Sequence, residues 1–320
     1  MKTIALGGVL RCSRIAYGCM PLGGAWDHTP LTATILAKAV RAVHAALDAG
    51  VDCFDHADIY CRGKSETVFA QALAELTGRR DKLILQSKVG IVFAGDPHPD
   101  SPQRFDYSYE HIVSSLEKTL TRLGTDYLDL YLLHRPDALV EPQEVARAFD
   151  DLHRAGKVRH FGVSNHTRAQ IELLRRSLTQ PLLVNQVELS LVHSHLIDAG
   201  IVTNQGKHSF GADGTLDYCR LTTTTLQAWG PVAGGRAVGG TGTPRAVTLA
   251  RVVTAMAAAK GVSPEALVVA WLLRHPAGIQ PVIGSTDPAR ITAIARADAV
   301  TLSREDWYAL YIAGRGEALP

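Results

Sequence analysis

Short apolar runs alternate with longer amphipathic segments along the chain. Several of the short runs are almost continuously apolar, which is typical of parallel strands that are buried on both faces. The longer segments repeat apolar residues every three or four positions, as Ile112, Leu116 and Leu120 do, and this spacing predicts helices. The runs predicted to be strands span residues 14–18, 52–56, 82–88, 127–134, 158–165, 182–189, 224–231 and 279–284.

Segments with helical periodicity lie between these runs. The segment at 32–49 is followed by Gly50 and the segment at 109–123 by Gly124, and glycine is the usual residue just beyond a helix C-terminus. Pro142 is expected in the first turn of a helix at 142–155. Further helices are expected at 65–76 and 167–177. Eight strands that alternate with helices predict a single (β/α)8 TIM barrel over residues 1–320, rather than two domains.

Four stretches lie outside this repeat. Residues 1–13 precede the first barrel strand and are expected to form a hairpin that closes the barrel floor. Residues 94–108 are rich in Pro, Asp and Ser and predict a long loop. Residues 192–222 predict another, with a short helix near Asp217, and glycines between 234 and 242 predict a flexible segment. Long loops of this kind are expected at the C-terminal face of the barrel, where they are often functional.

Composition narrows the class of protein. The chain is 46% hydrophobic and 20% charged with a net charge of +2, which excludes a disordered chain and argues against nucleic-acid binding through bulk charge. Its five cysteines show neither a disulfide framework nor zinc spacing, so we expect free thiols, no metal and a reducing compartment. Because the sequence shows no signal peptide and no long apolar span, we expect a cytoplasmic protein without membrane contact.

Four chemically reactive side chains fall at the ends of successive strands. In a (β/α)8 barrel the catalytic residues lie at the carboxyl ends of the strands. The second predicted strand leads into Asp55 and Tyr60, the third ends at Lys88, and the fourth ends at His134. Each residue alone has an ordinary explanation, such as a salt-bridged lysine or a core histidine. Their joint occurrence at one rim indicates a catalytic site.

The four groups complement one another. A free tyrosine has a pKa of about 10, and a neighbouring ammonium should lower it. We therefore expect Tyr60 to be a general acid that protonates an oxygen as hydride reaches the adjoining carbon. Lys88 should lower the pKa of the phenol, Asp55 should hold the lysine, and His134 should orient the substrate carbonyl.

Seven stretches follow one another between about Ile15 and Ala297: GVDCFDHADIYCRGKSE, LQSKVG, LDLYLLHRPD, GKVRHFGVSN, NQVELS, AWGPVAGG and PVIGSTDPARI. In this order they resemble the aldo-keto reductase family over nearly the whole chain. The resemblance implies an NADP(H)-dependent oxidoreductase on a (β/α)8 barrel that reduces aldehydes or ketones to alcohols. The resemblance implies that the catalytic tetrad of the family corresponds to Asp55, Tyr60, Lys88 and His134, the same four residues that the chemical argument above selects.

The resemblance also implies a cofactor site. Side chains at the positions of Ser164, Asn165 and Gln186 hydrogen-bond the nicotinamide carboxamide in the family, and an aromatic residue at the position of Trp229 stacks on the ring. Gly18 and Met20 would border the nicotinamide. The resemblance places the pyrophosphate loop at Gly230, Pro231, Val232, Gly234 and Gly235, and the adenosine 2′-phosphate site at Gly284, Ser285, Thr286 and Arg290.

The 2′-phosphate site departs from the family pattern. Many members carry a lysine where Gly284 stands and a Glu-Asn pair where Ala293 and Ile294 stand, so Arg290 is left as the cation of the motif. A hydroxyl pair, a helix N-terminus and an arginine still suit a phosphate. We expect NADP(H) as the cofactor and keep NAD(H) as an alternative. The pairs Gly7-Gly8 and Gly23-Gly24 lack the spacing of a dinucleotide fingerprint, which excludes a Rossmann fold.

The substrate is less defined than the chemistry. Trp26 and His28 are candidates for lining the pocket, and aromatic residues at Trp26, Phe105 and Phe210 favour a hydrophobic aldehyde or ketone. The expected partner is a small carbonyl compound, and the oligomeric state is left open. Two other functions are kept: a regulatory subunit that binds the cofactor with little turnover, and a Schiff-base lyase that uses Lys88.

Overall fold

Eight parallel strands close into a barrel in the order β3-β4-β5-β8-β9-β10-β11-β12. The computed structural model describes residues 1–76, 78–202, 214–240 and 243–320. Each barrel strand matches one predicted run to within two residues at either end, so the predicted (β/α)8 TIM barrel is confirmed. The strands are β3 (Ala16–Gly18), β4 (Cys53–Asp55), β5 (Ile84–Val89), β8 (Leu128–Leu133), β9 (Val158–Ser164), β10 (Leu182–Glu188), β11 (Thr225–Trp229) and β12 (Gln280–Ile283).

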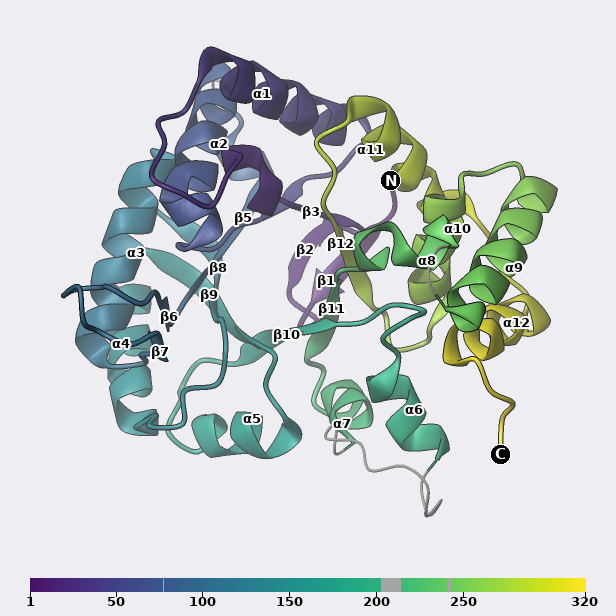
Figure 1. Cartoon of the computed structure of the whole chain (residues 1–320). Helices are drawn as coiled ribbons and strands as arrows, with labels where there is room; N and C mark the ends of the chain where they lie inside the picture. The colour runs from purple at the N-terminus through teal and green to yellow at the C-terminus, as the bar shows by residue number, and fades with distance from the viewer. Residues whose placement is uncertain (77, 203–213, 241–242) are drawn as a thin grey trace.

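Helices surround the barrel (Figure 1). In α3, Ile112, Leu116 and Leu120 are buried as their spacing predicts, Ser108 caps the first turn, and Gly124 ends the helix at φ 64°. The helices are α1 (Ala33–Asp48), α2 (Lys64–Glu75), α3 (Tyr109–Leu123), α4 (Pro142–Arg154), α5 (Arg168–Arg175), α6 (His195–Ile201), α7 (Thr215–Leu221), α8 (Arg236–Gly239), α9 (Pro244–Lys260), α10 (Pro264–Arg274), α11 (Pro288–Ala295) and α12 (Arg304–Arg315).

A hairpin closes the floor of the barrel, as predicted from residues 1–13. Strands β1 (Thr3–Leu6) and β2 (Leu10–Ser13) pair antiparallel. Leu6 and Cys12 are buried in one apolar cluster with Leu130 and Leu183 of the barrel strands. The turn needs glycine at position 7, because φ there is +57° and a Cβ atom would lie 2.5 Å from Cδ2 of Leu183.

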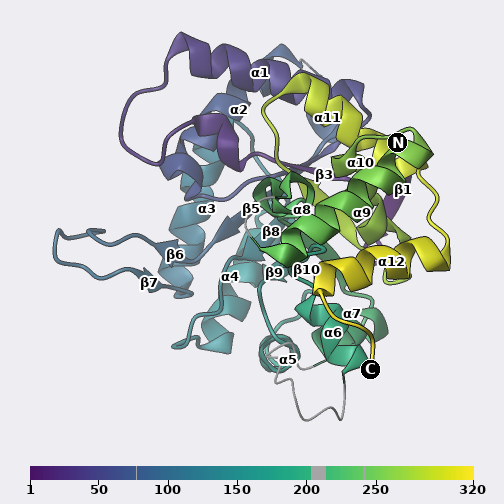
Figure 2. The same cartoon turned by 45° about the vertical axis from the view of Figure 1, so that its right-hand side comes forward.

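The long loops contain more structure than the sequence indicates. Residues 94–108, predicted to be a loop, include β7 (Arg104–Phe105), which pairs with β6 (Ile91–Val92). Figure 2 shows this arm projecting from the barrel. Strands of two residues are too short to produce an alternating pattern, which is why they were missed. The helix predicted near Asp217 is confirmed as α7, whereas Phe210 lies outside the described residues.

The segment predicted to be flexible begins with a 3-10 turn (Ala233–Gly235) and continues as α8. Helix α9 follows α8, and the next helix, α10, is buried from Ala266 to Leu273. Within the described ranges no single helix is long and apolar enough to cross a bilayer. The pair α9 and α10 reaches that length and composition only when the two are taken together across a 90° bend.

Candidate active site

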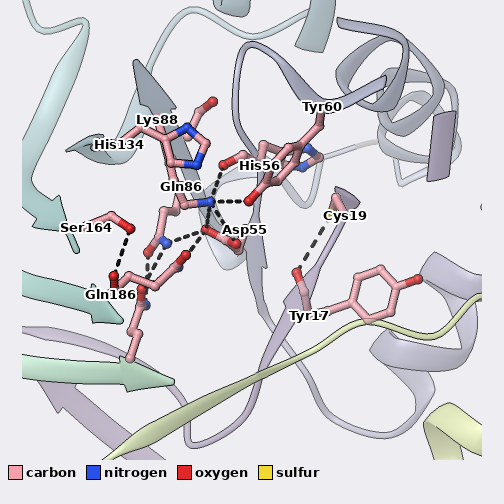
Figure 3. A network of polar contacts seen from close by, with 12 residues as sticks. Tyr17, Cys19, Asp55, His56, Tyr60, Gln86, Lys88, His134, Ser164 and Gln186 are labelled. Atoms are coloured by element: carbon pink, nitrogen blue, oxygen red, sulfur yellow. Dashed lines mark hydrogen bonds and ion pairs between the residues drawn. The ribbon is translucent and has the colours of Figure 1, made fainter. Parts of the chain in front are cut away.

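Lys88 lies at the centre of the polar cluster at the C-terminal rim (Figure 3). Its Nζ donates to Oδ2 of Asp55 at 2.9 Å, to the backbone oxygen of His56 at 2.8 Å and to the hydroxyl of Tyr60 at 2.8 Å. The side chain is 0% exposed, so all three ammonium hydrogens are used inside the protein. Because the Asp55 carboxylate and the Tyr60 hydroxyl favour the charged form, they raise the pKa of Lys88 against the opposing effect of burial.

Asp55 is held by amides as well as by the lysine. Its Oδ1 accepts from Nε2 of Gln86 at 2.5 Å and from Nε2 of Gln186 at 3.0 Å. Both glutamines also donate to Oε1 of Gln227, whose own amide donates to Gln86 and to Gln280. Nε2 of Gln280 then donates to Cys12 and to the backbone of Ser13 at the barrel floor. Every amide hydrogen of these four glutamines therefore has a partner, and the chain of bonds runs from the floor to Asp55.

The backbone after Tyr60 turns sharply and fixes the phenol. Cys61 and Arg62 have φ values of 48° and 58°, which are costly for residues other than glycine. Sγ of Cys61 lies 3.2 Å from the backbone oxygen of Met20 and 3.1 Å from that of Gly24, and these two oxygens share its single S–H hydrogen. The ring of Trp26 meets that of Tyr60 edge-on at 6.3 Å between centroids. The loop after β3 thus holds the phenol over the barrel.

The sequence predicts that Lys88 lowers the pKa of Tyr60. Lys88 does act in that direction, but the pKa of Tyr60 as a whole is raised, so the predicted lowering is wrong. Burial raises the pKa of Tyr60 to about 12, while the Lys88 ammonium lowers it and Asp55 raises it further. Burial dominates because a phenolate loses its hydration in the barrel, and the carboxylate beside Lys88 offsets part of the ammonium's field. Tyr60 is therefore protonated at neutral pH.

His134 follows β8 and is neutral. Burial, together with the positive charges of Lys88 and Arg135, holds the pKa of His134 well below its usual range. Its ring stands edge-on to Tyr60, with centroids 6.0 Å apart. Its buried Nδ1 has no hydrogen-bond partner within the described part of the chain. An uncharged imidazole beside the phenol can hydrogen-bond a substrate oxygen without becoming charged itself.

A second buried charged cluster supports the site from outside the barrel. Oε2 of Glu66 accepts from Nε of Arg122 at 2.6 Å, and Oε1 accepts from Ser87 at 2.8 Å. Asp58 lies in the same region, and its backbone N–H donates to the oxygen of Lys88. Burial, with a contribution from the neighbouring Glu66, raises the pKa of Asp58 to about 8. This carboxyl is therefore predominantly protonated at neutral pH.

The side chains of Asp55, Tyr60 and His134 line a cavity of about 680 Å³. Lys88 lies behind Tyr60 rather than in the wall, and His28 and Thr286 are outside the lining. The structure otherwise brings the predicted site residues together. The predicted residues that line the cavity are Gly18, Met20, Trp26, Asp55, Tyr60, His134, Ser164, Asn165, Gln186, Trp229, Gly230, Pro231, Val232, Gly234, Gly235, Gly284, Ser285 and Arg290.

The residues predicted to bind the carboxamide already bond to one another. Nδ2 of Asn165 donates to the oxygen of His134 at 3.1 Å and to Oγ of Ser164 at 2.9 Å, and Ser164 donates to the backbone of Gln186. Nε1 of Trp229 donates to Oδ1 of Asn165 at 3.0 Å. Since these donors are used, the groups can offer a ligand mainly acceptor oxygens, which suit the NH2 of an amide.

The sequence matches the Aldo/keto reductase family over residues 14–313. The chain belongs to the aldo-keto reductase family. It is 38% identical over 290 residues to a 6-dehydroglucose reductase of Novosphingobium aromaticivorans, which covers 89% of this chain and 88% of the relative. It is 34% identical to a protein of the same name from Agrobacterium fabrum, over 99% of both chains.

A solved aldo/keto reductase from Klebsiella pneumoniae, in complex with NADP and acetate, is 26% identical. The match has a TM-score of 0.74 and covers 97% of this chain and 94% of that one. The aldo-keto reductase described here is thus a member of an oxidoreductase family that uses a nicotinamide cofactor.

Sequence reasoning missed several residues of this aldo-keto reductase's cavity. Arg135 directly follows His134, so its place at the strand end could have been found. Glu265 lies in the first turn of α10, a segment without any motif, and only the tertiary packing brings it to the cavity. The missed apolar residues of the wall are Ile59, Ile91, Val282, Ile283 and Ile294.

Proposed function

We propose that the chain reduces an aldehyde or ketone to the alcohol, with NADPH as the hydride donor and Tyr60 as the general acid. The contact of Lys88 with both the Tyr60 hydroxyl and Asp55 carries this proposal. It gives a protonated phenol in the cavity wall and a buried cation beside it. Such a pair suits an oxygen that gains charge and then a proton.

The cavity fits a nicotinamide dinucleotide. Gly230, Gly234 and Gly235 line it with positive φ, and a Cβ added at any of them would meet nothing within 4 Å, so their backbone is open to an extended ligand. Trp229 adds an apolar ring, and Asn165 and Gln186 add oxygens for an amide. When bound, the reduced nicotinamide supplies the hydride.

The residues of the chain handle the proton. His134 orients the carbonyl oxygen, and Tyr60 gives its proton to that oxygen. An alcohol is about as weak an acid as water and a much weaker acid than a phenol, so proton transfer from Tyr60 to the alkoxide oxygen is downhill even at the raised pKa of Tyr60. Lys88 stabilises the resulting phenolate, and Asp55 with its two glutamine donors keeps Lys88 in place.

The first substrate to try is 6-dehydroglucose, because two relatives carry that name. Trp26 and Arg135 lie in the cavity wall and offer a ring face and a hydrogen-bond donor to a hydroxylated aldehyde. The aromatic residues that favoured a hydrophobic substrate do not all line the cavity. Trp26 does, whereas Phe105 lies on β7, outside the lining.

Two other functions are less well supported. A Schiff base requires a neutral amine, whereas Lys88 is buried, bonded to a carboxylate and raised in pKa. A regulatory subunit would not need Asp55, Tyr60, Lys88 and His134 assembled in one place. Turnover of any carbonyl compound separates that alternative from the proposal.

The test is Tyr60→Phe, with Tyr308→Phe as the control because Tyr308 lies outside the cavity. We expect Tyr60→Phe to lower kcat by about 10²- to 10⁴-fold, the usual contribution of a general acid, while the Kd for NADPH changes little. NADPH oxidation is followed with 6-dehydroglucose and a panel of hydrophobic aldehydes. A Tyr60→Phe variant with near-normal kcat on the best substrate would overturn the role of Tyr60.

A further inference from the structure

An ion pair lines the end of the cavity that is formed by α10 and α11. Nη2 of Arg290, in the first turn of α11, lies 3.1 Å from Oε1 of Glu265, in the first turn of α10. Both side chains belong to the cavity wall, and they are 55% and 19% exposed, respectively. The cation that the sequence assigns to a phosphate is therefore already paired with a carboxylate.

A second carboxylate, that of Asp287, accepts hydrogen bonds from backbone amides at the N-terminus of α11. Oδ1 of Asp287 accepts from the backbone nitrogens of Ala289 at 2.9 Å and Arg290 at 3.4 Å, so the first turn of α11 is capped by an acid. The other arginine in the described cavity wall is Arg135. Its Cζ lies 5.7 Å from the ring centroid of Trp229, at the end of the cavity where the nicotinamide is expected. Among the described residues at the α10–α11 end, the carboxylates of Glu265 and Asp287 thus both lie close to Arg290, one at its guanidinium and one at its backbone nitrogen.

We propose that Glu265 sets the choice between NADH and NADPH. This inference rests on the proposed function, because it concerns the adenosine ribose of the same cofactor. A carboxylate accepts a hydrogen bond from the 2′-hydroxyl of NADH, as acidic residues do in other dinucleotide sites. It repels the 2′-phosphate of NADPH, which carries about −1.5 to −2 charges, and competes with it for Arg290. The protein therefore accepts NADH beside NADPH.

The experiment compares the Kd values of NADH and NADPH, measured by calorimetry, in the wild type and in Glu265→Gln. The substitution keeps the shape of the side chain and removes its charge. Glu117→Gln is the matched control, since Glu117 pairs with Lys157 on the outer surface and is outside the cavity lining. A third variant, Arg290→Met, removes the cation.

We expect the wild-type Kd values for the two cofactors to lie within about tenfold of each other. Glu265→Gln should tighten NADPH binding about tenfold, equal to about 1.4 kcal/mol, without tightening NADH binding. Arg290→Met should weaken NADPH more than NADH, and Glu117→Gln should change neither.

Three results would overturn the inference. One is a wild type that binds NADPH more than about a hundredfold tighter than NADH, which is about 2.7 kcal/mol of preference. The second is a Glu265→Gln variant in which the ratio of the two Kd values is unchanged, although both cofactors bind. The third is a wild type that binds neither cofactor, and only this result would also overturn the proposed function.

Discussion

Replacing Gln86 with leucine tests whether the amides around Asp55 contribute to catalysis. Gln86 donates to Asp55 and to Gln227 and accepts from Gln227. Leucine has a similar volume and removes all three bonds. Asp55 keeps its bonds to Lys88 and Gln186, and Gln227 keeps those to Gln186 and Gln280. No group is stripped of every partner, so the variant should fold.

The cost follows from the bonds that are lost. A hydrogen bond to a charged group contributes about 1.5–3 kcal/mol and a neutral one about 0.5–1.5 kcal/mol. The burial of additional apolar surface by leucine offsets part of this loss. We expect the free energy of unfolding to fall by about 3 kcal/mol. We expect kcat to fall about tenfold, or about 1.4 kcal/mol, because Asp55 and Lys88 are held less firmly.

Urea unfolding measures the first quantity, and steady-state kinetics on the best substrate measures the second. Gln280→Leu is the matched control, because Gln280 bonds to Gln227 and to the floor of the barrel but not to Asp55. It should lower stability by a similar amount and leave kcat within about twofold, which is less than 0.5 kcal/mol. In both variants KM should change little. If the two variants lose kcat equally, Gln86 acts only through general stability and its role in positioning Asp55 is refuted.

Two further predictions concern the charged cluster behind the site. Arg122→Met leaves the buried Glu66 without its cation and should lower the free energy of unfolding by about 3–5 kcal/mol, measured by urea unfolding; a loss below about 1 kcal/mol would contradict a buried pair. Asp58→Asn concerns pH. Because the folded pKa of Asp58 is raised to about 8, the stability it contributes is full below pH 4 and is lost as pH rises from about 4 to about 8. The variant cannot titrate there, so its stability should fall less between pH 5 and pH 8, by up to about 1.4 kcal/mol per pH unit, and equal slopes in urea unfolding would refute the assignment.

The barrel, and the meeting of Asp55, Tyr60, Lys88 and His134 at one rim, could be predicted from the sequence because both depend on local pattern. Strands buried on both faces are continuous apolar runs, and Asp55, Lys88 and His134 stand at the ends of three of them. The barrel topology alone then brings these ends together. The glutamines could have been found in part, since Gln86 is two residues before Lys88 and so faces the same side of the strand.

Other features depend on contacts that no local pattern records. Glu265 reaches Arg290 because α10 packs beside α11, and the sequence contains no sign of that pairing. The raised pKa of Tyr60 results from the depth of burial, which outweighs a neighbouring ammonium that the sequence did identify. The arm that contains Phe105 has strands too short to produce a period.

The glutamine chain that links the barrel floor to Asp55 has a consequence for how the enzyme responds to its surroundings. Primary amides are uncharged, and they neither gain nor lose a proton between mildly acidic and mildly alkaline conditions. A scaffold of lysines and glutamates in the same place would rearrange as its members ionised. Here the glutamines that set the position of Asp55 keep the same charge under acidic and alkaline conditions. We therefore expect the pH dependence of catalysis to come from the ionisable groups at the rim, and not from the glutamines inside the barrel.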